Sequence, residues 1–455
     1  MLTQKYMNFI NELITNAMSN FQKKVNHPNV RYIDMLSSLT LEFEIIIKNS
    51  IVSFLERMDY EYRNSDLRKQ SYHVKKNEYR NLTTRFGNIR FMRTVYQHIY
   101  TGSIFTYVDR SLGLVRYDLY DPDIKGMILE YASDNSDAVT ARHISDFINK
   151  TSQMKSNISR QFVRHVINST NLPIPKVEQL PDVDTLYVMA DEKFVPTQND
   201  DKHLFVKHAV IFEGMTERYT GQYKLKNKHN IAVVGKGLKT AILDYINTAY
   251  DVSKIKMIYV MGDGASWIKK ISTYMKFHEE SEVIRSLDKF HFKQAVRHIS
   301  IDEDIQKVIV DYVLNGTKTQ LKQLVQILID RYPHRKEPLT RKLNYLNSHK
   351  KEIQLLYEHG LSCPMESQIS HNIAALFASR PKGYSRKHFK KRLHLRMMNR
   401  NKISIKALYV ENLHKNETDL NIQKINKQLF GTFEPMDPIS FIDHKGSDRY
   451  YSIKA

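Results

Sequence analysis

The sequence predicts an α/β fold whose sheet carries acidic residues at the ends of buried strands, with helical parts before and within it. Residues 255–261 form an apolar run that is typical of a strand buried on both faces of a parallel sheet. The run leads to Asp263, which lies between two glycines, and Trp267 then begins a predicted helix. Open α/β sheets bind ligands at this carboxyl end of their strands. Taken alone, a Gly-Asp-Gly turn without function explains the pattern equally well.

Two further acids lie at comparable places. Residues 184–191 form a short apolar run that ends in Asp191, and residues 204–212 form a second predicted strand. Farther along, Glu366 lies in the first turn of a predicted helix that begins near Pro364. Two strand-borne aspartates and one helix-borne glutamate, in this order, are what a ribonuclease-H-like nucleotidyl-transfer site needs. Three carboxylates can hold two divalent ions on a phosphate, so the predicted catalytic and metal-binding set is Asp191, Asp263 and Glu366, with two Mg²⁺ or Mn²⁺ ions.

Several sequence blocks resemble a known family. They are GDGASWI at residues 262–268, LDKFH at 287–291, ESQISHN at 366–372 and SRPKGYS at 379–385. In order and spacing they resemble the ISLre-type bacterial insertion-sequence transposases, distant relatives of the Mutator-like group. The similarity runs from about residue 60 to about residue 400.

The resemblance implies a ribonuclease-H-like core with an all-helical insertion at about residues 292–361. It also implies metal-dependent DNA cleavage and strand transfer, with His291 at the edge of the active site as a phosphate contact. From its residues alone, His291 could equally lie in a polar pocket. This chain has Glu192 where the family more often has Gly, and Tyr384 where Trp is expected. Asp184 and Glu192 therefore remain alternatives to Asp191 as the first ligand.

Composition indicates the partner and the compartment. The formal net charge of +20 on 455 residues indicates a polyanionic partner, and double-stranded DNA is the usual one. No apolar run approaches the roughly 18 residues that a membrane span needs, and the N-terminus lacks the layout of a secretory signal. We expect a bacterial cytoplasmic, nucleoid-associated protein. The single cysteine, Cys363, excludes an intrachain disulfide, and a buried inert thiol is favoured over a nucleophile paired with His359 or His371.

The chain divides into five predicted regions. They are an N-terminal helical region (1–57), a basic β-hairpin region (58–112), a helix-turn-helix-like region (113–180), a ribonuclease-H-like catalytic domain (181–400) and a C-terminal tail (401–455). The first region has apolar residues at helical spacing, which indicates two or more amphipathic helices. These helices fit a packed helical hairpin or a dimerisation arm.

The second region combines a strong positive charge with a hairpin pattern. Residues 62–94 contain nine Lys or Arg and two acids, and strand-like segments flank Gly87-Asn88, which is typical of a hairpin turn. One face of this hairpin would bring Arg85 and Arg90 to a phosphate backbone. The alternative is a basic surface that only water contacts.

The third region is predicted to read DNA. Helices are expected at 122–132, 137–149 and 157–168, before a proline-rich linker that begins near Leu172. The last helix has an apolar face formed by Ile158, Phe162, Val166 and Ile167. Its other face carries Arg160, Gln161 and Arg164, which would enter the major groove. Many ordinary helical pairs have the same pattern.

The end of the catalytic domain is again basic. Residues 380–402 contain ten Lys or Arg and no acid, which predicts a groove that carries DNA through Arg380, Arg386, Lys390, Lys391 and Arg392. The predicted function is a transposase that binds insertion-sequence ends and works as a homo-oligomer, at least a dimer. The alternatives are an inactive transposon-derived DNA-binding protein and a structure-specific DNA nuclease.

Overall fold

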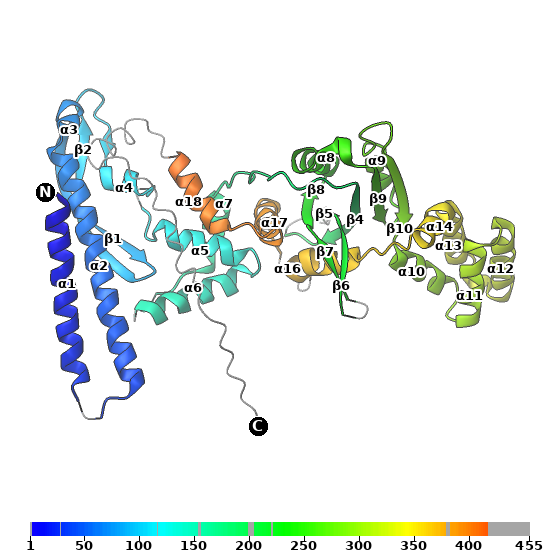
Figure 1. Ribbon diagram of the computed structural model, residues 1–455, viewed down its shortest axis with the longest axis horizontal. Coiled ribbons are helices and arrows are strands. Elements are labelled where there is room, and N and C mark those ends of the chain that lie inside the picture. The colour runs from blue at the N-terminus through cyan, green and yellow to red at the C-terminus, as the bar shows by residue number, and fades with distance from the viewer. Residues whose placement is uncertain are drawn as a thin grey trace. The chain divides into compact units, whose positions relative to one another are not determined.

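The computed structural model describes residues 2–27, 29–115, 117–152, 156–198, 204–219, 222–378 and 383–416. The chain forms two compact units, each with its own core (Figure 1). The first unit comprises the chain up to Lys125, residues 146–156 and the chain from Val410. The second comprises residues 126–145 and 157–409. No helix in the described ranges is long and apolar enough to cross a bilayer.

The first unit combines a helical hairpin with a small antiparallel sheet. Its elements are α1 (Leu2–Val25), α2 (Tyr32–Asn64), α3 (Asp66–Ser71), β1 (Tyr72–Thr84), β2 (Gly87–His98), β3 (Ile104–Phe105) and α4 (Tyr107–Ser111). Leu55 and Tyr62 of α2 pack on Phe91 and Tyr96 of β2, and all four side chains are buried. The amphipathic pattern of the first region therefore corresponds to helices, and the second of them packs on the hairpin.

The turn of the basic hairpin lies two residues before the predicted position. Thr84 pairs with Gly87, so the turn is Arg85-Phe86 rather than Gly87-Asn88. The Thr84 hydroxyl donates to the Gly87 carbonyl at 2.9 Å and accepts from the Phe86 amide at 3.1 Å, which closes the turn from within. Gly87 takes a φ of +105° as the first residue of β2, where a side chain would be strained.

The second unit contains a mixed five-stranded sheet. Its strands are β4 (Thr185–Val195), β5 (Leu204–Phe212), β8 (His229–Val234), β9 (Met257–Gly262) and β10 (Glu282–Leu287), in the order β10-β9-β4-β5-β8. Strand β5 is antiparallel to β4 and β8, whereas β9 is parallel to β4 and β10. A separate hairpin is formed by β6 (Gly214–Tyr219) and β7 (Gln222–Lys226). The buried parallel strand predicted before Asp263 is thus β9.

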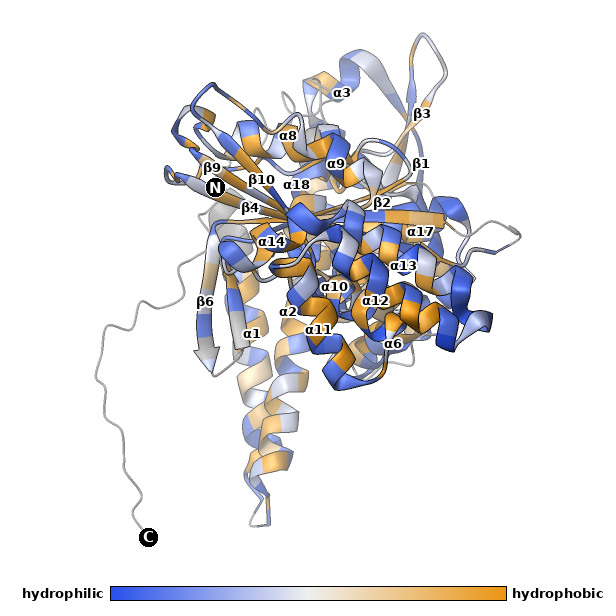
Figure 2. Ribbon diagram, turned by 90° about the vertical axis from the view of Figure 1, so that its right-hand side faces the viewer, coloured by the Kyte–Doolittle hydropathy of each residue, from blue (hydrophilic) through white to orange (hydrophobic). Residues whose placement is uncertain are grey.

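Alternation along the strands gives the sheet two different faces. Val188 and Ala190 of β4 pack with α8 (Leu238–Ala249) and α9 (Ser266–Ser272). Met189 of β4 and Met261 of β9 point to the opposite face, where they pack against α14 (Lys350–Glu358) and α15 (Met365–Ile369). Strand β9 is mostly orange in Figure 2, as expected of a strand covered on both sides.

The long helical segment predicted after residue 292 is present as a block of five helices. They are α10 (Lys289–Ile299), α11 (Glu303–Leu314), α12 (Lys318–Arg331), α13 (Lys336–Ser348) and α14, and the break falls at Asn315-Gly316. The block has its own apolar core, which includes Phe292, Ile309, Val325 and Leu339. These helices show orange on one side and blue on the other in Figure 2.

The remaining helices of the chain flank the sheet domain in sequence. Before it come α5 (Pro122–Ala132), α6 (Asp137–Ser152) and α7 (Arg160–Ser169), and then the irregular segment 170–184. After α15 the chain continues as a π-helical turn, η3 (Ser370–Ala374), and α16 (Ala375–Phe377), followed by α17 (Arg386–Arg400) and α18 (Ile405–Asn416). Most of the predicted C-terminal tail lies outside the described residues.

Candidate active site

Neighbouring parallel strands bring two of the predicted acids together. Ala190 of β4 pairs with Gly262 of β9, so Asp191 and Asp263 follow at the same level on adjacent strands, roughly 5 Å apart in the backbone. Strand β4 continues to Val195 because it stays paired with β5, so Asp191 lies inside a strand and not at its end as predicted. The Asp263 carboxylate accepts from the Ala265 amide at 2.8 Å, which starts the turn into α9.

Glu366 approaches from the helix on the same face. It lies in the first turn of α15, next to Met365, and Met365 packs with Met189 and Met261. Each of these two methionines is two residues before one of the aspartates, and residues two apart point to the same face of a strand. Glu366 and the two aspartates therefore share the α15 face at one end of the sheet.

The electrostatics of Asp191 link the three acids. Burial, with smaller contributions from the charges of Asp263 and Glu366, raises the pKa of the Asp191 carboxyl to about 6. The Glu192 amide, which donates to Asp191 Oδ1 at 2.7 Å, and the nearby His291 act in the opposite direction. The end of the sheet thus concentrates negative charge that its own residues only partly offset.

A fourth acid at this site was not among the predicted site residues. Leu287 of β10 also pairs with Gly262, so Asp288 stands beside Asp263 on the strand next to β9. Asp288 is almost completely buried, caps α10 through the Phe290 amide at 2.9 Å, and lies 3.2 Å from Nδ1 of His291. This contact raises the pKa of His291, and the charges of Asp191 and Asp263 raise it further. The signal in the sequence was an acid directly after a predicted strand.

The turn around Asp263 is held by the helical block. The Tyr345 hydroxyl of α13 donates to the Asp263 carbonyl at 2.8 Å. Gly264 has a φ of +88°, and a Cβ on it would lie 2.5 Å from the His349 ring. A Cβ on Gly262 would lie 2.7 Å from the Ala190 carbonyl. The two glycines are therefore needed to let β4 and the helical block approach Asp263 closely.

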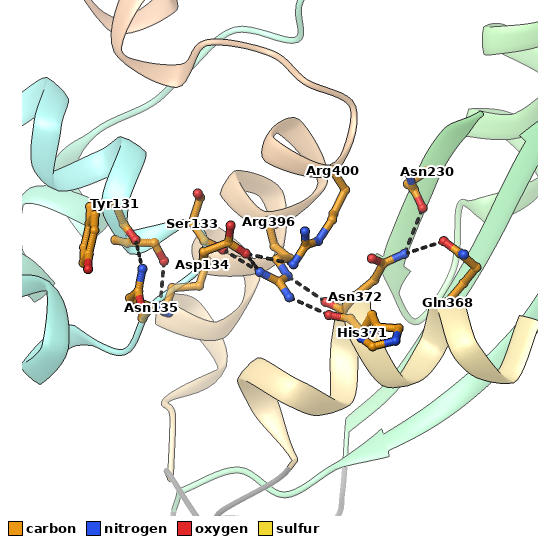
Figure 3. Close-up of polar contacts among 12 residues, drawn as sticks. Tyr131, Ser133, Asp134, Asn135, Asn230, Gln368, His371, Asn372, Arg396 and Arg400 are labelled. Atoms are coloured by element: carbon orange, nitrogen blue, oxygen red, sulfur yellow. Dashed lines mark hydrogen bonds and ion pairs between the residues drawn. The ribbon is translucent and has the colours of Figure 1, made fainter. Parts of the chain in front are cut away.

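The helix of Glu366 is anchored by a buried arginine on α17. Arg396 donates to the carbonyl oxygens of His371 and Asn372, the latter at 3.0 Å, and pairs with Asp134 (Figure 3). These two carbonyls belong to the π-helical turn η3, which directly follows α15. The Asn372 amide in turn donates to Asn230 of β8 at 2.9 Å. Polar contacts thus fix the segment that follows Glu366 on two sides.

The structure distinguishes Asp191 from Asp184 and Glu192, the two alternatives to it as the first metal ligand. Asp184 precedes β4, at the end of the strand roughly 20 Å from Asp191. Glu192 follows Asp191 directly and therefore points to the opposite face of the sheet. Asp191 lies near enough to Asp263 and Glu366 for their charges to raise its pKa.

The three candidate ligands are carboxylates, which hard divalent cations prefer, and their negative charge is only partly compensated by neighbouring residues. Within the described ranges, no three His, Cys, Asp or Glu side chains are already arranged as a cluster that could hold a metal ion. The residues that would hold an ion are Asp191, Asp263 and Glu366.

The predicted DNA contacts fall into two groups. Arg160, Gln161 and Arg164 are exposed on α7, and Arg386 and Lys390 are exposed on α17. On the hairpin, Arg90 is exposed and stacks on Tyr79 at 4.1 Å, but Arg85 is half-buried and bonded to Asp123 at 2.6 Å. On α7, the buried apolar residues are Val163, Val166 and Ile167, and Ile158 is buried just before the helix, so Val163 takes the place predicted for Phe162.

Two of the predicted DNA contacts on α17 are instead structural. Arg392 is completely buried and bonded to Asp137 at 2.5 Å, so it is not available to a phosphate. Lys391 donates to the Thr170 carbonyl at 2.7 Å and to Asn171. A run of basic residues looks continuous in the sequence, but every third or fourth residue of this helix faces the core. Arg380 lies outside the described residues.

Cys363 is a buried core residue. It packs with Met189, Met365 and Ile369, and burial raises the pKa of its thiol well above the ordinary value. The charges of Asp288 and Asp191 raise the pKa further. A thiolate is therefore disfavoured, which matches the inert reading of this residue.

Comparison with known sequences places this site in a family. Residues 32–413 match the profile of the family described as "Uncharacterised protein family (UPF0236)". A UPF0236 protein of Caldanaerobacter subterraneus subsp. tengcongensis is 27% identical over 364 residues, which cover 78% of this chain and 74% of the relative. A second protein of that organism, whose name combines eleven designations, is 26% identical over 411 residues, or 88% and 82% of the two chains.

A more distant relative comes from another genus. The "UPF0236 protein in vanSb 3'region" of Streptococcus gallolyticus is 25% identical over 291 residues, which cover 62% of each chain. The matched range includes all four acids of the candidate site and the three helices, α7, α10 and α17, that carry predicted DNA contacts. The chain belongs to the UPF0236 family.

Proposed function

We propose that this protein is a metal-dependent DNA transposase of the Asp-Asp-Glu type. The observation that supports the proposal is that Asp191, Asp263 and Glu366 lie on one face of the sheet, near enough for the charges of Asp263 and Glu366 to raise the pKa of Asp191. Carboxylates far apart in the sequence are costly to place together unless they share a cation. A site of this kind suits phosphoryl transfer on a nucleic acid.

The order of the strands supports a ribonuclease-H-like core. Strands β4, β5 and β8 form an antiparallel meander, and β9 and β10 are added in parallel on the other side of β4. A ribonuclease-H-like sheet has the same sequence of directions. In this proposal, helices α10–α14 are the all-helical insertion, because they interrupt the chain between the last strand and the helix of Glu366.

Each residue of the site has a role in the proposed reaction. Bound divalent ions would lower the pKa of the attacking hydroxyl and neutralise the charge that builds up on the phosphate. Asp191 and Asp263 supply ligands from rigid strands, and Glu366 supplies one from the anchored helix α15. His291, whose raised pKa favours the imidazolium, would contact a phosphate oxygen at the edge of the site. Asp288 orients that ring and holds the start of α10.

The charge of the protein supports DNA as the substrate. The net charge is +20, and exposed basic residues occur on α7, on α17 and on the hairpin. In the proposal, α7 reads the element ends and the other basic surfaces hold the backbone. Two ends must be joined in one reaction, so the active form is at least a dimer.

The names of the relatives are consistent with proteins that a mobile element encodes. One name joins eleven designations within a single organism, which we interpret as identical copies in one genome. Another relative is named for its position beside vanSb. Repeated copies at scattered positions are expected of an insertion sequence.

The test is cleavage of DNA that carries the ends of the element flanking the coding region. The wild-type protein with Mg²⁺ or Mn²⁺ should nick at the ends and join them to a target. Asp263→Asn should abolish both steps and keep DNA binding, because the shape is unchanged and a hard ligand is lost. Asp184→Asn is the matched control and should cleave normally.

Other outcomes point to the alternatives. Cleavage of branched DNA without any requirement for element ends would identify a structure-specific nuclease. Binding of the ends without cleavage under any divalent ion would identify an inactive DNA-binding protein. Cleavage by Asp263→Asn at the wild-type rate would remove the metal-carboxylate mechanism.

A further inference from the structure

The second unit contains a basic cavity on the face of the sheet opposite the acids. Its volume is about 560 Å³, and it lies between the first half of β5, the start of α8 and helix α9. Six side chains define its chemistry: Lys207, Lys236, Lys239, Lys270, Trp267 and Tyr274. No acidic residue belongs to the described lining. The four lysines come from three separate segments, namely β5, the stretch that enters α8 and helix α9, so the fold and not a single run of sequence assembles the charge.

The lysines have aromatic neighbours and lack carboxylate partners. Nζ of Lys207 lies 4.7 Å from the centre of the Trp267 ring, and Nζ of Lys239 lies 3.8 Å from that of Tyr274. In the described part of the chain, none of the four ammonium groups forms an ion pair with a carboxylate. Like charges in one cavity repel each other unless an anion joins them.

The loop that enters α8 is built from two glycines with unusual backbone conformations. Gly235 has a φ of +83° and Gly237 a φ of +109°, and a Cβ on either would meet nothing within 4 Å. Glycine is therefore required at both positions because of the positive φ, and not because a side chain would collide with a neighbour. The loop leads into α8, a helix of 12 residues. The free backbone amides at the start of this helix lie beside three of the lysines. The ring nitrogen Nε1 of Trp267 is buried and has no hydrogen-bond partner among the described residues.

An exposed aromatic pair shares the sheet face of Lys207, and the cavity lies at the same end of the sheet as the acids. Phe194 and Phe205 are opposite each other on β4 and β5, about half exposed, with ring centres 4.1 Å apart. They are two positions from Lys207 and share its face. Lys207 also directly precedes His208, the partner of Asp191 in the strand register. The acids and the cavity thus occupy the two faces of one sheet end.

We propose that this cavity binds a nucleotide of single-stranded DNA next to the bond that is cleaved. Lysines and a helix start suit the phosphate, and Trp267 and Tyr274 offer rings on which a base can stack, the combination that proteins use to hold unpaired strands. The inference rests on the proposed function, because cleavage at an element end requires a strand to leave the duplex beside the acids. A free nucleotide has the same chemistry and must be distinguished from DNA by experiment.

Trp267 makes the test direct, since it is the only tryptophan of the chain. Its fluorescence in the full-length protein, without divalent ions, reports on this cavity alone. A single-stranded oligodeoxythymidylate should quench it saturably, more strongly than thymidine monophosphate or inorganic phosphate. Tyr274→Ala should weaken the binding roughly fivefold to 100-fold. Lys239→Gln with Lys270→Gln should weaken it roughly tenfold or more and flatten its salt dependence.

The matched control is Lys254→Gln with Lys256→Gln, which removes the same charge from exposed positions at the other end of β9. This control should bind the oligonucleotide like the wild type. Absence of quenching, or equal affinity for the monophosphate and the oligonucleotide, would overturn the inference. Cleavage of element ends without quenching would remove this cavity from the reaction and leave the proposed function standing. Quenching by a protein that never cleaves element ends would support binding in this cavity and contradict the proposed function.

Discussion

Asp191 and Asp263 stand side by side on neighbouring parallel strands, each one residue beyond the paired residues Ala190 and Gly262. The pairing of Leu287 with the same glycine adds Asp288 on the third strand. The sheet thus presents an acid at one level of three consecutive strands. Glu366 reaches the first two from α15 on the face that they share. Such a concentration of charge has consequences for stability as well as for function.

The charge of Asp191 should destabilise the metal-free protein at neutral pH. Folding raises the pKa of this group from 3.8 to about 6, so the folded state binds the proton more tightly than the unfolded state. Stability therefore falls as the pH rises from about 4 to about 6, and above that range the cost is fully present, at most about 3 kcal/mol. Asp191→Asn, which keeps the acceptor for the Glu192 amide, should raise Tm at pH 8 in a chelator.

The dependence of Tm on pH distinguishes this electrostatic effect from a change in side-chain packing. The gain in Tm of Asp191→Asn should shrink towards pH 4, where the wild-type carboxyl is protonated. Asp184→Asn, at the other end of β4, should show no such trend. An Asp191→Asn protein that melts below the wild type at pH 8 would show that the carboxylate is compensated in the folded state.

Arg396 should act as a positioning residue for Glu366. Its guanidinium holds two carbonyls of η3 and Asp134, and a lysine in its place keeps the charge but cannot reach all three partners. Arg396→Lys should reduce cleavage by folded protein about tenfold or more and leave DNA affinity unchanged. Arg400→Lys is the control, because Arg400 is partly exposed and bonds to Asp134 from the outer side. Cleavage at the wild-type rate by a folded Arg396→Lys protein would contradict this role.

The sequence allowed the strands and the three acids to be predicted because their signals are local. An apolar run followed by an acid and a turn marks Asp263 in one short segment, and the same applies to Glu366 at its helix start. Whether Asp191 lies on the same face of the sheet as Glu366 depends on how the strands pair, and no local sequence pattern indicates this pairing. The roles of Asp288, Tyr345 and Arg396 depend on contacts between segments far apart in the chain.

The basic helix α17 shows the limit of arguments from charge. Its run of lysines and arginines predicted a surface, but burial of Arg392 beside Asp137 is decided by the tertiary packing of α17 against other helices. The turn of the hairpin has a similar cause. Gly87-Asn88 is a strong turn signal, yet the hydroxyl of Thr84 closes the chain two residues earlier.

Arg392 and Lys390 should therefore respond differently to the same substitution. Arg392→Gln removes the closest cationic partner of the buried Asp137, which keeps only His388 and the more distant Arg164, and this should cost roughly 3 kcal/mol in the free energy of unfolding. Lys390→Gln changes an exposed residue and should leave stability within about 0.5 kcal/mol. Denaturant unfolding of the two variants makes the comparison. A stable Arg392→Gln protein would show that the ion pair is dispensable.

The last prediction concerns the DNA contact that we propose for α7. Ser159 caps this helix by accepting from the Phe162 amide at 3.0 Å, and the burial of Val163 and Val166 fixes which residues face outward. Arg164 is 3.6 Å from the buried Asp137, so its loss would also affect the core. Arg160 is the cleaner probe, because it is exposed at the first turn. Arg160→Gln should weaken binding to element ends by about 1–3 kcal/mol and barely change binding to an unrelated duplex.

The matched controls separate base reading from charge. Arg160→Lys keeps the charge but cannot bind a guanine edge with two parallel hydrogen bonds, so it should lose specificity almost as fully as Arg160→Gln. Lys390→Gln should instead weaken binding to both duplexes and reduce the slope of log affinity against log salt by about 1. Both duplexes are titrated over a series of salt concentrations. If Arg160→Gln loses affinity equally for both and lowers the slope as Lys390→Gln does, α7 holds the phosphate backbone and another element reads the bases.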